Sequence, residues 1–309
     1  MSTAFRFLLQ AREKLYSSGI LSTQRLHHPV ISVGNLTLGG TGKTPLVIAL
    51  AEHLRDRRFA PVILSRGYRR TSREILVVGS NWDEAGDEPY LMKQRLGNVP
   101  IIVGADRYRA GILAERKQLG NIFILDDGFQ HRRLHRDVDI VMIDPVEWAG
   151  GEALLPTGRW REPKSALTRA HAACIQDVAG FRMPSLPIPA FSVRTEILGL
   201  YTVDGPAPVE MLKGKAIVAF AGIAKPERFF AAVKSLGIRP LKCVRFRDHH
   251  RYSRREIEKL GGEILLTTEK DAVRLVGMGL TGFLYLRISA KIPDFERLMS
   301  IILERLPKL

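Results

Sequence analysis

Short apolar runs alternate with longer segments of helical periodicity along most of the chain. A run of about four to eight apolar, β-branched residues predicts a buried strand, whereas apolar residues that recur every three to four positions predict a helix packed on one face. The regular alternation of the two patterns predicts an α/β fold with a mostly parallel sheet.

The patterns place the expected elements as follows. Strands are predicted from Val30 onward and over residues 61–65, 75–78, 100–103, 122–127, 138–143, 172–175, 216–220, 241–246, 264–268 and 283–287. Helices are predicted over residues 3–21, 45–57, 106–118, 226–236, 253–260 and 292–305, with further helices after Pro89 and after Thr268.

A proline-rich stretch at 180–190 marks a boundary between two halves. We therefore expect a P-loop-type domain with an N-terminal amphipathic helix over residues 1–185, a strand-like linker over 186–208, and a smaller second α/β domain over 209–309. The active site is expected in the cleft between them.

A glycine-rich turn joins the strand that begins at Val30 to the helix at 45–57. Strand, glycine loop, Gly-Lys-Thr and helix is the layout of a phosphate-binding loop. Glycines allow successive backbone N–H groups to face one anion, and the positive end of the helix points to the same place. The common spacing expects a glycine where Thr37 stands, so the match is imperfect. The predicted nucleotide-binding residues are Thr37, Leu38, Gly39, Gly40, Thr41, Gly42, Lys43 and Thr44.

The apolar run at 122–127 ends in Asp126 and Asp127. A buried strand that carries an acid at its tip is typical of the Walker B arrangement, in which the carboxylate holds Mg²⁺ beside the phosphates. We predict Thr44, Asp127 and Asp126 as magnesium ligands. ATP and Mg²⁺ are therefore the expected cofactors.

The helix predicted at 3–21 is amphipathic and basic. Phe5, Leu8, Leu9 and Leu15 fall near one face, although Arg12 interrupts the stripe. Such a helix can lie in a membrane interface, or it can pack on its own domain. The pattern alone leaves both alternatives open.

Composition narrows the class of partner. The 309 residues carry a net charge of +15, which favours anionic membranes, phosphorylated substrates or nucleic acid. Aromatic residues are only 7% of the chain and show no stacking pattern, which weakens the nucleic-acid interpretation. We expect no secretory signal and no membrane-spanning segment. Cys174 and Cys243 are predicted to be reduced core residues of a cytosolic protein.

Several motifs together identify a family. They are the stretch from Val33 to Pro45, Ser65-Arg66-Gly67-Tyr68, Gly86-Asp87-Glu88-Pro89, Asp126-Asp127-Gly128-Phe129-Gln130-His131, Leu155-Pro156 with Arg161-Glu162, Asp248-His249, and Thr268-Glu269-Lys270-Asp271. Because it carries these motifs in this order, the chain resembles the tetraacyldisaccharide 4′-kinases, the lipid A kinases of Gram-negative bacteria. The late-glycine phosphate loop is itself that family's form.

The resemblance implies transfer of the ATP γ-phosphate to the 4′-hydroxyl of a tetraacylated glucosamine disaccharide 1-phosphate, giving lipid IV-A in lipopolysaccharide biosynthesis. It implies that Asp87 is the catalytic base, that His249 is its partner and that Lys43 is catalytic. Further nucleotide or substrate contacts are implied for Glu88, Arg107, Gln130, His131, Arg161 and Glu162.

The resemblance also implies a peripheral protein on the cytoplasmic face of the inner membrane. It favours membrane contact through residues 3–21, and a monomer is expected. One rival function is a P-loop ATPase switch that cycles on membranes without a lipid acceptor. A second is a nucleic-acid-binding module, although we expect no nucleic-acid partner. Neither rival predicts Asp87, Asp126-Asp127 and His249 as a set.

Overall fold

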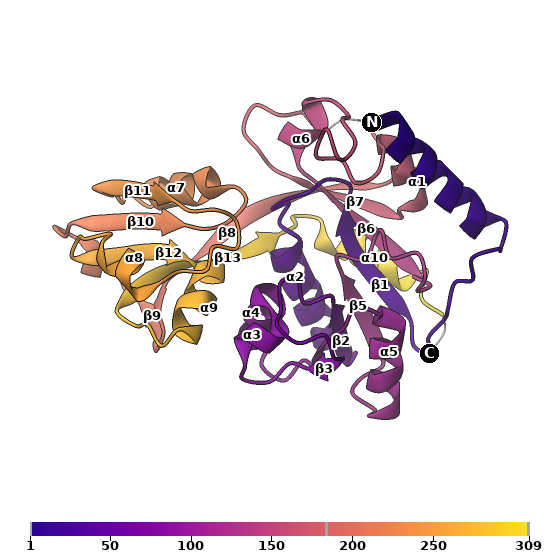
Figure 1. The fold of residues 1–309 in the computed structure, drawn as a ribbon, viewed down its shortest axis with the longest axis horizontal. Coiled ribbons are helices and arrows are strands. Elements are labelled where there is room, and N and C mark those ends of the chain that lie inside the picture. The colour runs from indigo at the N-terminus through magenta and orange to yellow at the C-terminus, as the bar shows by residue number, and fades with distance from the viewer. Residues whose placement is uncertain (1, 183–184, 308–309) are drawn as a thin grey trace.

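One β-sheet runs through both halves of the molecule. The computed structural model describes residues 2–182 and 185–307. In the sheet the strands follow the order β11-β10-β12-β13-β8-β7-β6-β1-β5-β2-β4-β3, and β9 pairs with β8. Figure 1 shows the result as two α/β lobes joined by the long strands β8 and β13. The expected mixed α/β class with a mostly parallel sheet is confirmed.

The first lobe is built on parallel strands. Its strands are β1 (Val30–Asn35), β2 (Pro61–Ser65), β3 (Leu76–Val77), β4 (Ile101–Val103), β5 (Ile122–Asp126), β6 (Val138–Ile143) and β7 (Ala172–Gln176). Its helices are α1 (Ser2–Ser17), α2 (Lys43–Asp56), α3 (Trp82–Ala85), α4 (Asp87–Leu96), α5 (Arg107–Arg116), α6 (Pro145–Ala149) and the 3₁₀ helix η1 (Lys164–Arg169). Every residue of β1 is buried, as expected for a parallel strand covered on both faces.

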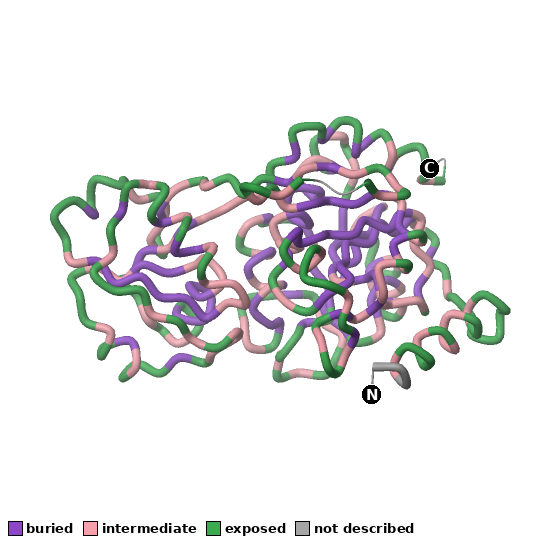
Figure 2. Tube along the Cα trace, turned by 90° about the horizontal axis from the view of Figure 1, so that it is seen from above, coloured by how far each residue is buried: buried purple, intermediate pink, exposed green. Residues whose placement is uncertain are grey.

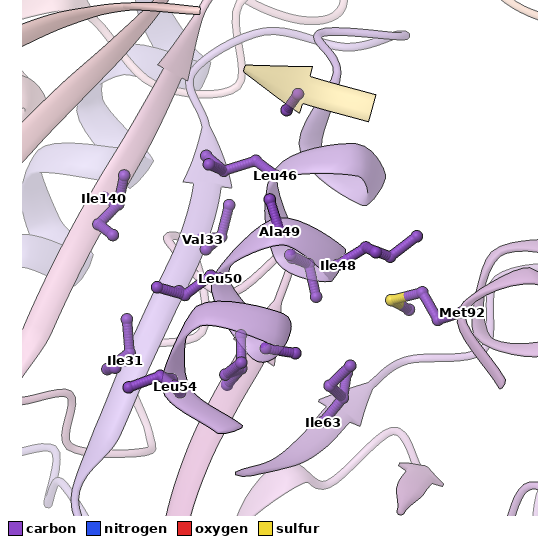
Figure 3. Close-up of a cluster of buried hydrophobic side chains, with 14 of the residues drawn as sticks. Ile31, Val33, Leu46, Ile48, Ala49, Leu50, Leu54, Ile63, Met92 and Ile140 are labelled. Atoms are coloured by element: carbon purple, nitrogen blue, oxygen red, sulfur yellow. The ribbon is translucent and has the colours of Figure 1, made fainter. Parts of the chain in front are cut away.

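Helix α2 fixes the site because it packs directly on β1. Figure 3 shows Leu46 and Leu50 of α2 facing Ile31 and Val33 of β1, with Met92 of α4 on the opposite side. All five side chains are almost fully buried. The first turn of α2 is therefore held at the carboxyl end of β1, which is the edge where ligands bind in open α/β sheets.

The second lobe has its own smaller core. It contains β9 (Gly205–Ala207), η2 (Val209–Leu212), β10 (Ile217–Ala221), α7 (Pro226–Ser235), β11 (Lys242–Arg245), α8 (Arg254–Glu258), β12 (Ile264–Thr268) and α9 (Glu269–Gly277). Figure 2 shows the buried residues gathered in two regions, with partly exposed chain between them.

Strands β8 (Ala190–Thr202) and β13 (Phe283–Lys291) form the antiparallel ribbon between the lobes. The start of β8 pairs with β7 of the first lobe, and the start of β13 pairs with β12 of the second. After β13 the chain returns to the first lobe, where α10 (Phe295–Leu303) buries Leu298 and Ile302 in the same core as α2. Residues 290–302 thus pack with the first lobe, whereas the expected second domain runs to residue 309.

Most predicted elements are present, with shifted ends. Helix α2 begins two residues earlier than expected, so Lys43 and Thr44 lie in its first turn. Strand β13 is four residues longer than predicted because it continues into the ribbon. The short elements α3, α6, η1, β9 and η2 were not predicted. Cys174 is buried as expected, but Cys243 is exposed because it lies on the edge strand β11, so its assignment to the core is wrong.

Helix α1 has one packed face and one open face. It ends at Ser17, four residues before the predicted end. Phe5 and Leu9 pack against an apolar cluster of the first lobe, whereas Phe7 and Leu8 are 69% and 64% exposed. Arg12, which interrupts the apolar stripe, is paired with Glu162 at 3.2 Å. In the part of the chain that the structure describes, no helix has the length and apolar character needed to cross a bilayer.

The packing of α10 predicts a stability difference between two leucines of the same helix. Leu298 is fully buried in the first core, and Leu303 is 37% exposed. Leu298→Ala should lower the free energy of unfolding by about 2–5 kcal/mol through lost burial and a cavity. Leu303→Ala should change it by less than about 1 kcal/mol. Chemical denaturation of both variants measures the difference, and equal values would mean that α10 does not belong to the first core.

Candidate active site

The phosphate loop is organised from inside by Asn35. This buried residue ends β1, and its side-chain amide donates to the carbonyl oxygen of Thr37 at 2.7 Å and to the hydroxyl of Thr41 at 3.1 Å. Gly42 precedes α2 with a φ of 84°, a left-handed conformation that suits glycine. The loop therefore curls over the start of α2, and Lys43 stands at the first position of the helix.

The second lobe approaches the same loop. A Cβ atom built on Gly39, whose φ is 104°, would lie 2.4 Å from Arg159 Nη2 and 3.7 Å from the Cβ of Ala224. Ala224 belongs to the turn between β10 and α7. The positive φ favours glycine at this position, and a larger residue would also require the Arg159 side chain to move.

Asp127 lies directly after β5 and faces Lys43. Its carboxylate is 3.3 Å from Lys43 Nζ and accepts hydrogen bonds from Arg161 Nη1 at 2.8 and 2.9 Å. Burial alone would raise the pKa of Asp127, but the charges of Lys43 and Arg161 outweigh it and lower the pKa below its usual value. Asp127 is therefore ionised beside the phosphate loop.

Asp126, the last residue of β5, differs from Asp127 in its protonation. It is buried and accepts a hydrogen bond from Ser65 Oγ at 2.8 Å. Burial raises the pKa of Asp126, and the negative charges of Glu88 and Asp127 raise it further. Burial and the repulsion among these three carboxylates thus raise the pKa of Asp126 to about 7, so that it is only partly ionised near neutral pH.

This arrangement fits Mg²⁺ in its chemistry. No group of three side chains is preformed as a metal site among the described residues. Even so, the oxygen donors of Asp126 and Asp127, together with the Thr44 hydroxyl, are the hard ligands that Mg²⁺ prefers, and it usually keeps several waters and binds through one or two carboxylates. A divalent cation here would relieve the repulsion that raises the pKa of Asp126.

Asp87 and His249 come from different lobes and meet at hydrogen-bond distance. Asp87 is the first residue of α4, and His249 lies in the loop after β11. His249 Nδ1 is 2.9 Å from Asp87 Oδ2. His249 Nε2 is 3.2 Å from Lys270 Nζ, which can only donate, so Nδ1 carries the proton and donates to Asp87. The predicted pair is thus brought together.

Arg274 also holds Asp87, and sequence reasoning missed it. This residue of α9 is 2% exposed, and its Nε donates to Asp87 Oδ2 at 2.7 Å. Burial would raise the pKa of Asp87, but the hydrogen bond from His249 and the charge of Arg274 outweigh it and lower the pKa to about 2. Both contacts use Oδ2, and no described group donates to Oδ1. Oδ1 can therefore still accept a hydrogen bond.

Lys270 completes a chain of contacts from α9 to α4. Besides His249, its ammonium contacts Glu88 Oε1 at 2.9 Å. Lys270 and Arg274 are four residues apart on α9 and therefore share one face of the helix. That face supplies the positive charge that compensates the negative charges of Asp87 and Glu88.

Strained backbone conformations are concentrated around the Asp87–His249 pair and Asp127. Of the five described non-glycine residues with positive φ, Arg69, Asp127 and His249 lie at or beside this site. Such conformations cost of order 1 kcal/mol or more and are concentrated where function requires a particular geometry.

The family resemblance also implies contacts for Gln130, His131, Arg107 and Glu162, and these residues have different surroundings. Gln130 donates to the carbonyl oxygen of Asn35 at 2.9 Å and accepts from Arg161. Burial lowers the pKa of His131 to about 4, so its ring is neutral near pH 7. Arg107 is buried beside Asp106. The carboxylate oxygens of Glu162 pair with Arg12 and Arg169.

A second contact between the lobes lies on the other side of the phosphate loop. Asp144 follows β6 and is buried, and Arg228 Nη2 of α7 approaches it at 2.6 Å. Lys225 also pairs with Asp144. The sequence pattern does not predict this contact.

A family profile described as Tetraacyldisaccharide-1-P 4'-kinase matches residues 1–307. The chain belongs to this family. The resemblance seen in the motifs is thereby confirmed. Tetraacyldisaccharide 4'-kinase of Aquifex aeolicus is 39% identical over 310 residues, covering 97% of this chain and 96% of the relative. The enzyme of the same name from Koribacter versatilis is 39% identical over 321 residues, covering 98% and 97%.

A solved structure of the family has the same fold. It is described as the "apo" form of LpxK from Aquifex aeolicus in complex with ATP, and it superposes with a TM-score of 0.86 at 38% identity. The match covers 99% of this chain and 97% of that one. The lobes and the ribbon are therefore features of this kinase family.

The position of Arg274 predicts a change in pH dependence. In Arg274→Met the cation that lowers the pKa of Asp87 is lost, while burial still raises it. Asp87 would then take up its proton at a higher pH. The acid limb of the kcat profile should shift upward by about 1–3 pH units. Arg274→Lys, which keeps the charge, should restore much of the wild-type profile. Superimposable profiles for wild type and Arg274→Met would rule out Arg274 as the residue that keeps Asp87 ionised.

Proposed function

We propose that this chain is the kinase for which its family is named, transferring the ATP γ-phosphate to the 4′-hydroxyl of a tetraacylated glucosamine disaccharide 1-phosphate. The observation that carries the proposal is the Asp87–His249 contact at 2.9 Å, close to a Lys-Thr phosphate loop. An ATPase switch needs the loop and the acids of β5 but has no use for a base with one oxygen free. The product is lipid IV-A, a precursor of lipid A.

The phosphate loop binds and orients ATP. Backbone N–H groups of residues 39–42 and the ammonium of Lys43 hold the β- and γ-phosphates, and the N-terminus of α2 faces the same charge. Thr44 and Asp127, with Asp126, would hold Mg²⁺, which would supply positive charge to neutralise the phosphates. Arg161, hydrogen-bonded to Asp127, adds positive charge beside the transferred group.

Asp87 receives the proton of the acceptor. The 4′-oxygen forms a bond to the γ-phosphorus while the bond from that phosphorus to the β,γ-bridging oxygen breaks, and the hydroxyl proton passes to Asp87 Oδ1. A carboxylate with a pKa of about 2 is a weak base. It suffices because the transition state is loose and the nucleophile loses its proton late. His249 holds the carboxylate in position through Oδ2.

The substrate's acyl chains place the reaction at a membrane. We propose that the open face of α1, with Phe7 and Leu8, lies in the bilayer interface. The +15 net charge would attract the protein to anionic lipid on the cytoplasmic face of the inner membrane. A monomer suffices, because both lobes of one chain supply the site.

Removal of the base tests the proposed reaction. Asp87→Asn should lower kcat for transfer of labelled γ-phosphate to the tetraacyl disaccharide 1-phosphate by about 10²–10⁴-fold, with the KM for ATP unchanged. Asp83→Asn is the matched control, because it removes another ion pair between the lobes, Asp83–Arg251 at 3.1 Å, and should leave the rate unchanged. Hydrolysis of ATP by wild type without labelled lipid would instead favour the membrane-cycling switch.

The open face of α1 predicts a loss of membrane binding without a loss of stability. The pair Phe7→Ser and Leu8→Ser removes exposed apolar groups and leaves Phe5 and Leu9 packed. Sedimentation with anionic vesicles should show weaker binding, while the melting temperature stays within about 2 °C of wild type. Unchanged partitioning would mean that α1 serves only internal packing.

A further inference from the structure

A short segment, residues 159–162, pairs with the first half of the phosphate loop. We call it the bracing segment. Its backbone runs antiparallel to the loop, and Trp160 faces Thr37 in a β-bridge. A backbone hydrogen bond of 2.7 Å lies on either side of this bridge, from Leu38 N to the carbonyl oxygen of Arg159 and from Arg161 N to that of Leu36. The bracing segment therefore fixes the path of the loop where it leaves β1.

Two consecutive residues of the bracing segment carry opposite charges and bind different parts of the first lobe. Arg161 donates to the carboxylate of Asp127. Glu162, the next residue, is 4% exposed, and its two oxygens pair with Arg12 and Arg169. Because both oxygens of this buried carboxylate are bound, Glu162 fixes the position of its neighbour Arg161.

Arg12 links the bracing segment to helix α1. Its Nη2 is 3.2 Å from the carboxylate of the segment. Phe5 and Leu9, which precede it by seven and three residues, lie on the same face of the helix. Both pack against the apolar cluster that contains Leu36 and Trp160. Helix α1 thus touches the paired backbone twice, through this apolar face and through one ion pair.

The other cation on Glu162 reaches the loop that carries Asp127. Arg169 of η1 lies over the ring of Phe129, with its Cζ 4.5 Å from the ring centroid. Phe129 is fully buried against β1, because a Cβ built on Gly34 would lie 2.5 Å from the Cβ of Phe129. A shift of Glu162 would therefore be felt both at the phosphate loop and at the loop after β5.

We propose that Glu162 is a positioning residue that couples the docking of helix α1 to the ATP site. With α1 docked, Arg12 and Arg169 hold Glu162, and Arg161 stays in the geometry that receives the phosphates. With α1 displaced, the buried carboxylate loses one of its two cations and the bracing segment loosens. The inference rests on the proposed kinase function and adds to it a link between the membrane helix and ATP affinity. The link acts in both directions, because a coupling free energy is reciprocal.

Nucleotide binding measured without a lipid acceptor tests this coupling. Full-length variants in neutral detergent are titrated with the β,γ-methylene analogue of ATP and Mg²⁺, and thermal unfolding verifies that each is folded. Arg12→Met should raise the Kd by about 3- to 30-fold. Arg12→Lys keeps the charge and should restore much of the affinity. Lys14→Met removes the same charge from an exposed position of the helix and should bind like wild type.

Hydrogen exchange of α1 separates coupling from a general loss of packing. In wild type the analogue should slow amide exchange in α1, although this helix lies outside the phosphate loop. In Glu162→Gln the analogue should leave that exchange unchanged, because the link is broken.

Three results would overturn the coupling. They are equal Kd values for Arg12→Met and wild type, equal losses in Arg12→Met and Lys14→Met, and exchange in wild-type α1 that does not respond to the analogue. Failure of wild type to bind the analogue would contradict the kinase function itself. Coupling in a chain that transfers no phosphate to the disaccharide lipid would support the inference and contradict only the proposed acceptor.

Discussion

A buried carboxylate shared between two lobes is the interaction on which this site depends. Asp87 belongs to the first lobe, whereas His249 and Arg274, which hold it, belong to the second. A buried anion without partners costs several kcal/mol or takes up a proton. The second lobe prevents this, because its hydrogen bond and its cation keep the pKa of Asp87 near 2. Asp87 thus keeps its low pKa only where the lobes meet.

The architecture explains how the two lobes are brought together at Asp87. The ribbon of β8 and β13 joins the lobes into one sheet, and α10 returns to the first core. Two polar contacts then lie on either side of the phosphate loop, Asp87 with Arg274 and Asp144 with Arg228. The second lobe thereby holds Asp87 and also approaches the glycine-rich loop through Ala224.

Local patterns predicted the parts of the site that depend on one strand and its neighbouring turn. Lys43 and Asp127 are examples, because parallel strands place their carboxyl ends at one edge of the sheet. The Asp87–His249 pair was implied only by the family resemblance. Arg274 was not predicted at all, since a lone arginine on an amphipathic helix resembles any surface residue until the other lobe buries it. The exposed Cys243 was missed for a similar reason, because strand order decides which strand is an edge.

We propose that Asp87 and His249 act as one catalytic unit assembled from two lobes. A double-mutant cycle on kcat with Asp87→Ala, His249→Ala and the combined variant tests it most directly, with thermal unfolding used to verify that each variant is folded. Residues that act as a unit show strongly non-additive effects. If the two residues act as one unit, the combined variant should be about as slow as the slower single variant. Losses that multiply in the combined variant would contradict it.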